Sequence, residues 1–196
     1  MTNSSARQEH AMRPDGWPPS GSLDDRFHHA LVENLHPPAW RNPKFASEYD
    51  LVVIGAGPAG LTAARDAAAL SAKVALIERD LIGGDRLNVG CVPSKALIRT
   101  ARLYAEMRDA ANFGAQVPGD IGIGFASVMA RMRRIQARLS RAASPLRLSE
   151  AGVDVYFGEA RFAGFDTVAV AGDVLRFRGH QTICSKPHAK RLGAGT

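Results

Sequence analysis

The sequence predicts an α/β fold in which helices pack on a parallel sheet and a β-hairpin follows. The first observation is the order of patterns over residues 51–78: an apolar run, a glycine-rich turn, a helix-forming stretch and a second apolar run. The second is the alternation of apolar residues over 167–178, which is typical of a hairpin. The third is size, since 196 residues that are 45% hydrophobic suffice for one domain with a buried core.

Residues 51–78 are the most strongly patterned part of the chain. Residues 51–54 (LVVI) are apolar and rich in β-branched side chains, which predicts a buried strand. Residues 58–70 are small or helix-favouring and predict a helix, and residues 73–78 (KVALIE) predict a second strand. Strand, helix and strand in this order form a βαβ unit with a right-handed crossover.

The later elements follow from periodicity. Residues 91–114 predict one long helix, and residues 125–142 predict a second, amphipathic one. Residues 150–162 predict a further strand, and residues 167–178 predict the hairpin.

The chain divides into three parts by composition. Residues 1–47 contain many prolines and no sustained periodicity, so we expect a loosely ordered leader. Residues 48–178 hold all the predicted elements and form the folded domain. Residues 179–196 are polar and basic without clear periodicity, and we expect them to be an atypical tail.

The net charge of +6 raises the question of nucleic-acid binding, because much of it lies in the arginine-rich stretch 129–147. The alternative is the solvated face of an amphipathic helix. We favour the helix because no aromatic platform interleaves the charges. The apolar positions that recur at steps of three and four are Phe125, Val128, Met129, Met132, Ile135 and Leu139.

Several other classes of protein are not predicted. No run of about 18 apolar residues occurs and the N-terminus lacks an apolar signal segment, so we expect no membrane span and no secretion. Two cysteines, Cys91 and Cys184, cannot form a disulfide framework, which favours a cytoplasmic protein. The N-terminal histidines lack the spacing of metal ligands, and we predict no metal site.

The glycine turn at residues 55–60 carries the first functional signal. Gly55 allows a tight turn, Gly57 lets the main chain approach a pyrophosphate, and Gly60 lets the helix pack closely on the strand. Glu78 ends the next strand, 18 residues after Gly60, where a carboxylate can bind a ribose diol. This Rossmann-like unit leaves FAD and NAD open, and the acid at Glu78 disfavours NADP at this site.

The second signal is GGDRLNVGCVPSK at residues 83–95, directly after the second strand. It closely resembles the redox-active signature of the class I pyridine nucleotide-disulfide oxidoreductases, whose usual pattern is G-G-x-C-x-x-x-x-C-x-P-S-K. That family includes the dihydrolipoamide-dehydrogenase-like proteins. The residues of this segment are most similar to those of its mercuric-reductase-like branch. The resemblance covers residues 30–178 and favours FAD over NAD for the first site.

The resemblance implies roles for particular residues. It places Cys91 beside the flavin as the flavin-proximal thiol, with NAD(P)H as the hydride donor in full-length members, which are homodimers. The residues that it implies contact FAD are Gly55, Gly57, Pro58, Ala59, Gly60, Glu78, Arg79, Gly83, Gly84, Asp85, Lys95 and Ala160.

Arg86 departs from the family pattern. The family has the interchange cysteine five residues before the flavin-proximal one, and here that position is Arg86. Arginine cannot form a mixed disulfide, so the sequence does not support ordinary disulfide reduction.

Three functional hypotheses follow. The first is the FAD-binding part of a flavin-dependent NAD(P)H:disulfide-type oxidoreductase. The second is a non-catalytic remnant or flavin-binding module without turnover. The third is a simple NAD-binding Rossmann domain, which leaves residues 83–95 unexplained. Because the resemblance stops near Arg178, we expect a truncated fold without the NAD(P)H and dimerisation domains.

Overall fold

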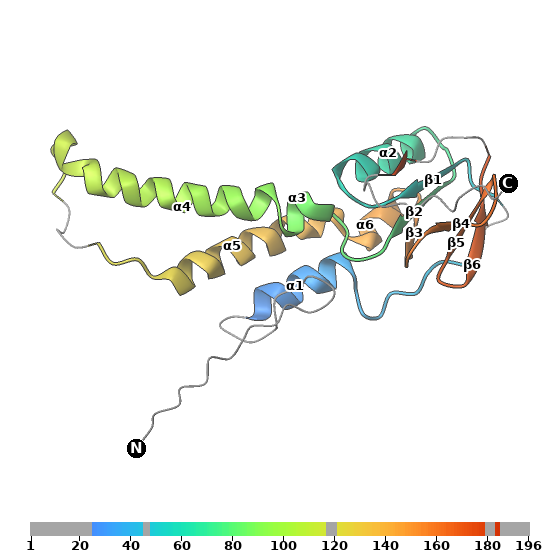
Figure 1. Cartoon of the computed structure of the whole chain (residues 1–196), viewed down its shortest axis with the longest axis horizontal. Helices are drawn as coiled ribbons and strands as arrows, with labels where there is room; N and C mark the ends of the chain where they lie inside the picture. Colours follow the sequence, from blue (N-terminus) through green and yellow to red (C-terminus); the bar gives the residue numbers. More distant parts are fainter. Residues whose placement is uncertain (1–24, 45–47, 117–120, 179–182, 185–196) are drawn as a thin grey trace, which may run out of the picture.

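The computed structural model describes residues 25–44, 48–116, 121–178 and 183–184. Figure 1 shows an α/β body from which a pair of long helices, α4 and α5, extends to one side. The helices of the body are α1 (Asp25–Leu35), α2 (Pro58–Ala69), α3 (Gly84–Asn88) and α6 (Pro145–Glu150). The long pair is α4 (Cys91–Asp109) and α5 (Phe125–Ser140), which continue into the 3₁₀ turns Ala110–Phe113 and Arg141–Ala143.

The central sheet is parallel and four-stranded, with the order β3-β2-β1-β7. Its registers pair Leu51 with Val74 and Val74 with Val153. The predicted α/β fold and its parallel sheet are therefore confirmed. The strands are β1 (Leu51–Ile54), β2 (Val74–Glu78), β3 (Val153–Phe157) and β7 (Ile183–Cys184).

The predicted hairpin is also present, as part of a three-stranded antiparallel sheet of order β4-β5-β6. Ala171 and Gly172 both have positive φ, as a tight two-residue hairpin turn requires. The strands are β4 (Arg161–Phe162), β5 (Thr167–Val170) and β6 (Asp173–Arg176).

Each face of the parallel sheet buries a separate core, because successive side chains of a strand point to opposite faces. Val53, Leu76 and Val155 pack against the side of α1, α2 and α6, where Leu35 and Leu148 are fully buried. On the other face, a second cluster joins the parallel sheet to the hairpin. Its buried members are Tyr49, Val52, Ala75, Ile77, Tyr156, Val168, Val170, Leu175 and Phe177.

The N-terminal part differs from the expected loose leader over the residues that are described. Helix α1 packs along α5, and its Leu31 and Leu35 are buried. Residues 36–44 then cross the edge strand β3, where Trp40 donates to the carbonyl of Val155 and Asn42 pairs with the main chain of Phe157. This segment therefore belongs to the fold, while residues 1–24 lie outside the described part.

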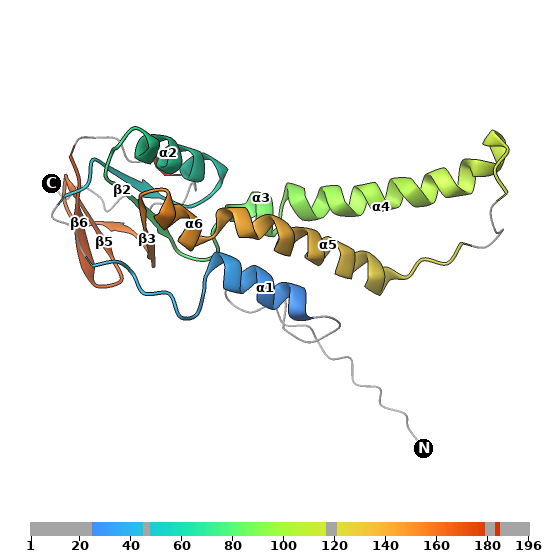
Figure 2. The same ribbon diagram turned by 180° about the vertical axis from the view of Figure 1, so that it is seen from behind.

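The arginine-rich helix α5 follows the predicted amphipathic pattern in part. Met132 is buried and Arg134 and Arg138 are exposed, as expected of a solvated basic face. Phe125 and Leu139, predicted on the apolar face, are 67% and 43% exposed. Phe125 is the first residue of α5, whose start lies away from the sheet (Figure 2).

Candidate functional site

The glycine turn connects β1 to the N-terminus of α2. Gly55 has a φ of +95°, and a Cβ on Gly60 would overlap the main-chain oxygen of Gly55. Both positions therefore require glycine, the first for its conformation and the second for the close packing of α2 on β1. Gly57 caps α2 and Pro58 occupies its first turn, and among the described residues no side chain caps this end. The free N–H groups of the first turn favour an anionic ligand.

Glu78, at the carboxyl end of β2, is bound to the glycine turn. Its side chain is 3% exposed. Oε2 accepts a hydrogen bond of 2.8 Å from the N–H of Ala56, and Oε1 accepts from the N–H groups of Arg79 and Asp80 at 2.9 and 3.0 Å. The carboxylate predicted to bind a ribose thus lies at the turn.

The Gly83–Gly84 pair packs directly on this turn, although it lies more than 20 residues further along the chain. The N–H of Gly83 donates to the carbonyl of Ala56 at 2.7 Å. A Cβ on Gly84, whose φ is +57°, would come within 2.9 Å of the Cα of Gly57. The two glycine motifs that the sequence singled out therefore form one backbone-lined site.

Cys91 begins α4 just beyond this contact. Its Sγ lies 3.9 Å from the main-chain oxygen of Arg86, and the thiol is half-buried. The main chain between them turns so tightly that a Cβ on Gly90 would lie 2.7 Å from the carbonyl oxygen of Asp85. The structure therefore brings positions 86 and 91 together, with the Arg86 side chain exposed.

Lys95 lies one turn further along α4 and is exposed. Arg79 is exposed and pairs with Asp80, with 3.2 Å between Nη2 and Oδ2. The hydrogen bond to Asp80 raises the pKa of Arg79 above its ordinary value. Ala160 precedes β4 and packs against the cluster between the two sheets.

The comparison with known proteins decides the family. The profile described as pyridine nucleotide-disulphide oxidoreductase matches residues 49–181, which is more than half of the chain. The chain belongs to this family.

Curated relatives of the family are similar over the same region. A dihydrolipoyl dehydrogenase of Acholeplasma laidlawii is 33% identical over 131 residues, which are 67% of this chain and 39% of that protein. Dihydrolipoyl dehydrogenases of Bacillus subtilis and Zymomonas mobilis are 38% and 39% identical, each over 61% of this chain and 25% of their own length. The chain thus spans about a quarter to two fifths of these relatives.

In this pyridine nucleotide-disulphide oxidoreductase chain, strand β7 is the fourth strand of the parallel sheet. It lies within residues 179–196, which the sequence analysis assigned to an atypical tail. Ile183 and Cys184 pair in parallel with Val53 and Ile54. From β1 the chain adds β2 and β3 on one side of the sheet and β7 on the other, so the strand order switches between β1 and β7. Ligands of open α/β sheets bind beside the carboxyl ends of the strands at such a switch point. The glycine turn at Gly55 lies there. The other tail residues, 179–182 and 185–196, lie outside the described part.

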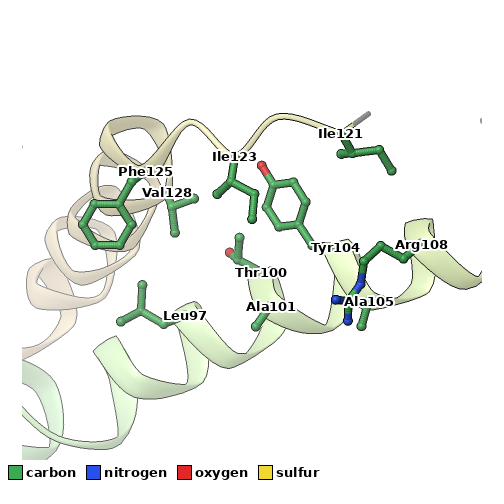
Figure 3. A pocket seen from close by; sticks show the side chains of 10 residues that line it. All are labelled: Leu97, Thr100, Ala101, Tyr104, Ala105, Arg108, Ile121, Ile123, Phe125 and Val128. Atoms are coloured by element: carbon green, nitrogen blue, oxygen red, sulfur yellow. The ribbon is translucent and has the colours of Figure 1, made fainter. Parts of the chain in front are cut away.

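A separate hollow of about 420 Å³ lies far along the long helices, between α4 and the segment that leads into α5. Figure 3 shows Leu97 and Tyr104 of α4 facing Ile123, Phe125 and Val128 across it. None of the residues predicted to contact a cofactor lines this hollow. The glycine-lined site is therefore the one that family membership and geometry both indicate.

Sequence reasoning missed two side chains that hold the Cys91 segment. Asn88 donates to the carbonyls of Leu81, Ile82 and Gly84, and Gln136 of α5 donates to the end of α3. Asn88 lies within the signature at residues 83–95, so its place in the sequence already pointed to a role near Cys91. Gln136 lies among arginines, and no local pattern distinguishes it.

Two further features concern the described residues as a whole. No helix among them is both long and apolar enough to cross a membrane. No group of three or more His, Cys, Asp or Glu side chains within the described ranges is arranged to hold a metal ion.

Proposed function

We propose that residues 48–178 are the FAD-binding portion of a flavin-dependent oxidoreductase in which Arg86 replaces the interchange cysteine. The observation that carries the proposal is the packing of Gly84 against Gly57 beside the buried Glu78. Family membership supports FAD as the ligand, since this is the cofactor that the sequence resemblance implies for the first glycine turn.

The residues present suit a dinucleotide chemically. A pyrophosphate needs N–H donors and room for close approach, and the start of α2 has no side-chain cap. Gly57 and Ala59 offer main-chain N–H groups there, while Pro58 carries no N–H and only shapes the first turn. A ribose diol needs an acceptor, which Glu78 supplies at the end of β2. In this proposal the remaining FAD contacts come from the residues named by the resemblance: Gly55, Gly60, Arg79, Gly83, Gly84, Asp85, Lys95 and Ala160.

Cys91 is proposed as the thiol beside the flavin. A bound FAD would supply two-electron chemistry at that position. With arginine at position 86, Cys91 has no partner there with which to form a disulfide. We therefore expect the chain to bind FAD without reducing disulfides, and we expect NAD(P)H as donor and a homodimeric assembly only for longer members of the family.

The second candidate function is a module of the same fold that holds no flavin and has no turnover. The observation that favours it is the state of Glu78, whose two carboxylate oxygens already accept three main-chain hydrogen bonds. A ribose would have to share these oxygens or displace those bonds.

Binding of FAD to the full chain separates the two candidates. The purified protein is titrated with FAD, and quenching of flavin fluorescence gives the affinity and stoichiometry. One bound FAD per chain supports the proposal, and a protein that takes up no FAD supports the second candidate.

A matched pair of glycine variants tests whether the flavin occupies this site. Gly84 and Gly114 both have positive φ, so alanine strains either position. Only Gly84 abuts the glycine turn, whereas a Cβ on Gly114 would meet nothing within 4 Å. We expect Gly84→Ala to abolish FAD binding and Gly114→Ala to leave it unchanged, and equal effects would place the flavin elsewhere.

A further inference from the structure

Helix α3 is only five residues long, and its carbonyl end is satisfied by unusual partners. The carbonyl of Asp85 accepts from the N–H groups of Val89 and Gly90, as at an ordinary helix end. The carbonyl of Arg86 lies 3.9 Å from the thiol of Cys91. The two remaining carbonyls, those of Leu87 and Asn88, need donors from another part of the fold.

Gln136 of α5 supplies both donors from a single side-chain nitrogen. Its Nε2 lies 2.9 Å from the carbonyl oxygen of Leu87 and 2.8 Å from that of Asn88, and the residue is 5% exposed. A carboxamide nitrogen carries two N–H groups, so it can serve two carbonyls at once. Gln136 is 48 positions from Asn88 in the sequence, and so it fixes α3 to a different helix.

We infer that Gln136 is a positioning residue for the thiol of Cys91. Cys91 follows Asn88 by three residues, and its Sγ rests against the carbonyl of Arg86 on the same short helix. Gln136 fixes the end of that helix and thereby the site of the thiol. The idea that this thiol faces a flavin rests on the proposed function. The positioning of the thiol by Gln136 does not depend on a bound flavin.

Arg131 provides a matched control on the same helix. It too donates from α5 to main chain near Cys91, with 3.2 Å between its Nη1 and the carbonyl oxygen of Ala96. That carbonyl lies within α4, past Cys91, where the helix carries its own hydrogen bonds. Loss of Arg131 therefore weakens the contact between α4 and α5 without freeing the end of α3.

The test is the rate at which iodoacetamide alkylates Cys91 in the full chain without FAD, followed by peptide mass spectrometry so that Cys184 is counted separately. Gln136→Met keeps the length of the side chain and removes both donors. We expect it to raise the alkylation rate of Cys91 about tenfold, because the end of α3 opens more often. Arg131→Met is expected to stay within about twofold of the parent while lowering Tm to a similar extent.

Equal rates in Gln136→Met and the parent chain would overturn the inference, and so would equal increases in the two variants. Should Gln136→Met fail to fold, Gln136→Asn retains the amide on a shorter stem, and its alkylation rate is expected to exceed that of the parent by less than about tenfold. A parent-like rate in Gln136→Asn would then overturn the inference.

A parallel FAD titration keeps the two proposals distinct. If the parent chain binds FAD, Gln136→Met is expected to weaken the affinity and Arg131→Met to preserve it. If no variant binds FAD, the proposed function fails, while the alkylation rates still decide the role of Gln136.

Discussion

Positions 86 and 91 lie together because the main chain folds back between them, whatever side chains they carry. The Sγ of Cys91 lies 3.9 Å from the main-chain oxygen of Arg86, and the tight turn at Gly90 is made by backbone atoms. A change of side chain at position 86 would therefore alter the chemistry of the pair and leave the main-chain geometry that places it.

The first prediction follows from this separation of geometry and chemistry. Arg86→Cys is expected to form a disulfide with Cys91 under mild oxidation, because the backbone already brings the two positions together. Free-thiol counting of the denatured protein should show one thiol, that of Cys184, and three after reduction. Arg86→Ser is the control and should keep two thiols throughout. Three free thiols in oxidised Arg86→Cys would show that the two positions do not approach closely enough.

Motif spacing in the sequence singled out residues that the structure brings together at one turn, and it did not reveal how the segment of Cys91 is held. Gly55, Gly60 and Glu78 could be predicted because each has one physical role that its position in a βαβ unit requires. The support from Gln136 could not be predicted, since it depends on α5 lying beside α3. Such long-range contacts leave no period in the sequence.

At the level of elements, Tyr49 joins the parallel sheet to the hairpin. Its hydroxyl donates to Asp154 at 2.8 Å and lies 2.8 Å from the hydroxyl of Tyr156. Burial is the largest cause that raises the pKa of Tyr49 far above its ordinary value of 10, followed by the bonds to Tyr156 and Asp154. Burial also raises the pKa of Tyr156.

The second prediction is a loss of stability at alkaline pH that depends on Tyr49. In the folded protein the raised pKa keeps Tyr49 protonated, whereas the unfolded chain ionises near pH 10. Its contribution to stability is therefore complete below that pH and declines as the pH rises above it. Urea unfolding from pH 8 to about 11 should show a shallower decline for Tyr49→Phe than for the parent. Tyr104→Phe, on the long helices, should retain the parent slope, and identical slopes for all three proteins would contradict the assignment.

Residues 36–44 act as a strap that occupies the hydrogen-bonding edge of β3. Asn42 pairs with Phe157 through both side-chain atoms, with 3.0 Å from Nδ2 to the carbonyl and 2.9 Å from the N–H to Oδ1. The ring of His36 stacks on Phe157 with 3.8 Å between centroids. A covered edge cannot pair with a second chain, which is how natural sheets limit aggregation.

The third prediction concerns this strap. Asn42→Ala is expected to lower the free energy of unfolding by about 1–3 kcal/mol, because it leaves the N–H and carbonyl of Phe157 without their partner. The neighbouring Arg41 is exposed and bonds only to the carbonyl of Trp40 among the contacts described, so Arg41→Ala should change the stability little. Urea titrations of the two variants make the comparison, and an Asn42→Ala protein as stable as the parent would show that the pairing of Asn42 with Phe157 does not stabilise the fold.

Local periodicity predicted the elements with long, regular patterns and missed those that depend on their surroundings. Helices α2, α4 and α5 and strands β1, β2 and β3 appear where the sequence predicted them. Helix α3 is not among the elements predicted from the sequence, because it begins at glycines with positive φ and relies on Gln136 and Asn88 for its end. Helix α1 did carry a signal, with Phe27, Leu31 and Leu35 four residues apart, which its proline-rich surroundings obscured.

On the scale of the whole molecule, burial is distributed unevenly between the body and the long helices. All five residues of β2 are buried, whereas Ala96 is the one buried residue of α4. No residue of α5 before Met132 is buried, and three of its four buried residues lie in the second half of the helix, nearest the body. Figures 1 and 2 show the two helices extending away from the sheet, so the far part depends on the contact between the helices themselves.

The last prediction is that the far part of the long helices opens at a lower free energy than the sheet. No residue described between 97 and 116 is buried, so little apolar surface stabilises α4 beyond Thr100. Hydrogen exchange followed by mass spectrometry should show the amides of this part exchanging at least roughly a hundredfold faster than those of β1 and β2. Peptides from the start of α4 provide the internal comparison, because Gln136 and Arg131 fix that end, and they should exchange at intermediate rates. Added FAD, if it binds at the glycine turn, should slow exchange around Gly57 and Gly84 and leave the far part unchanged. Protection that is equal along α4 and the sheet would mean that the long helices and the body unfold as one cooperative unit.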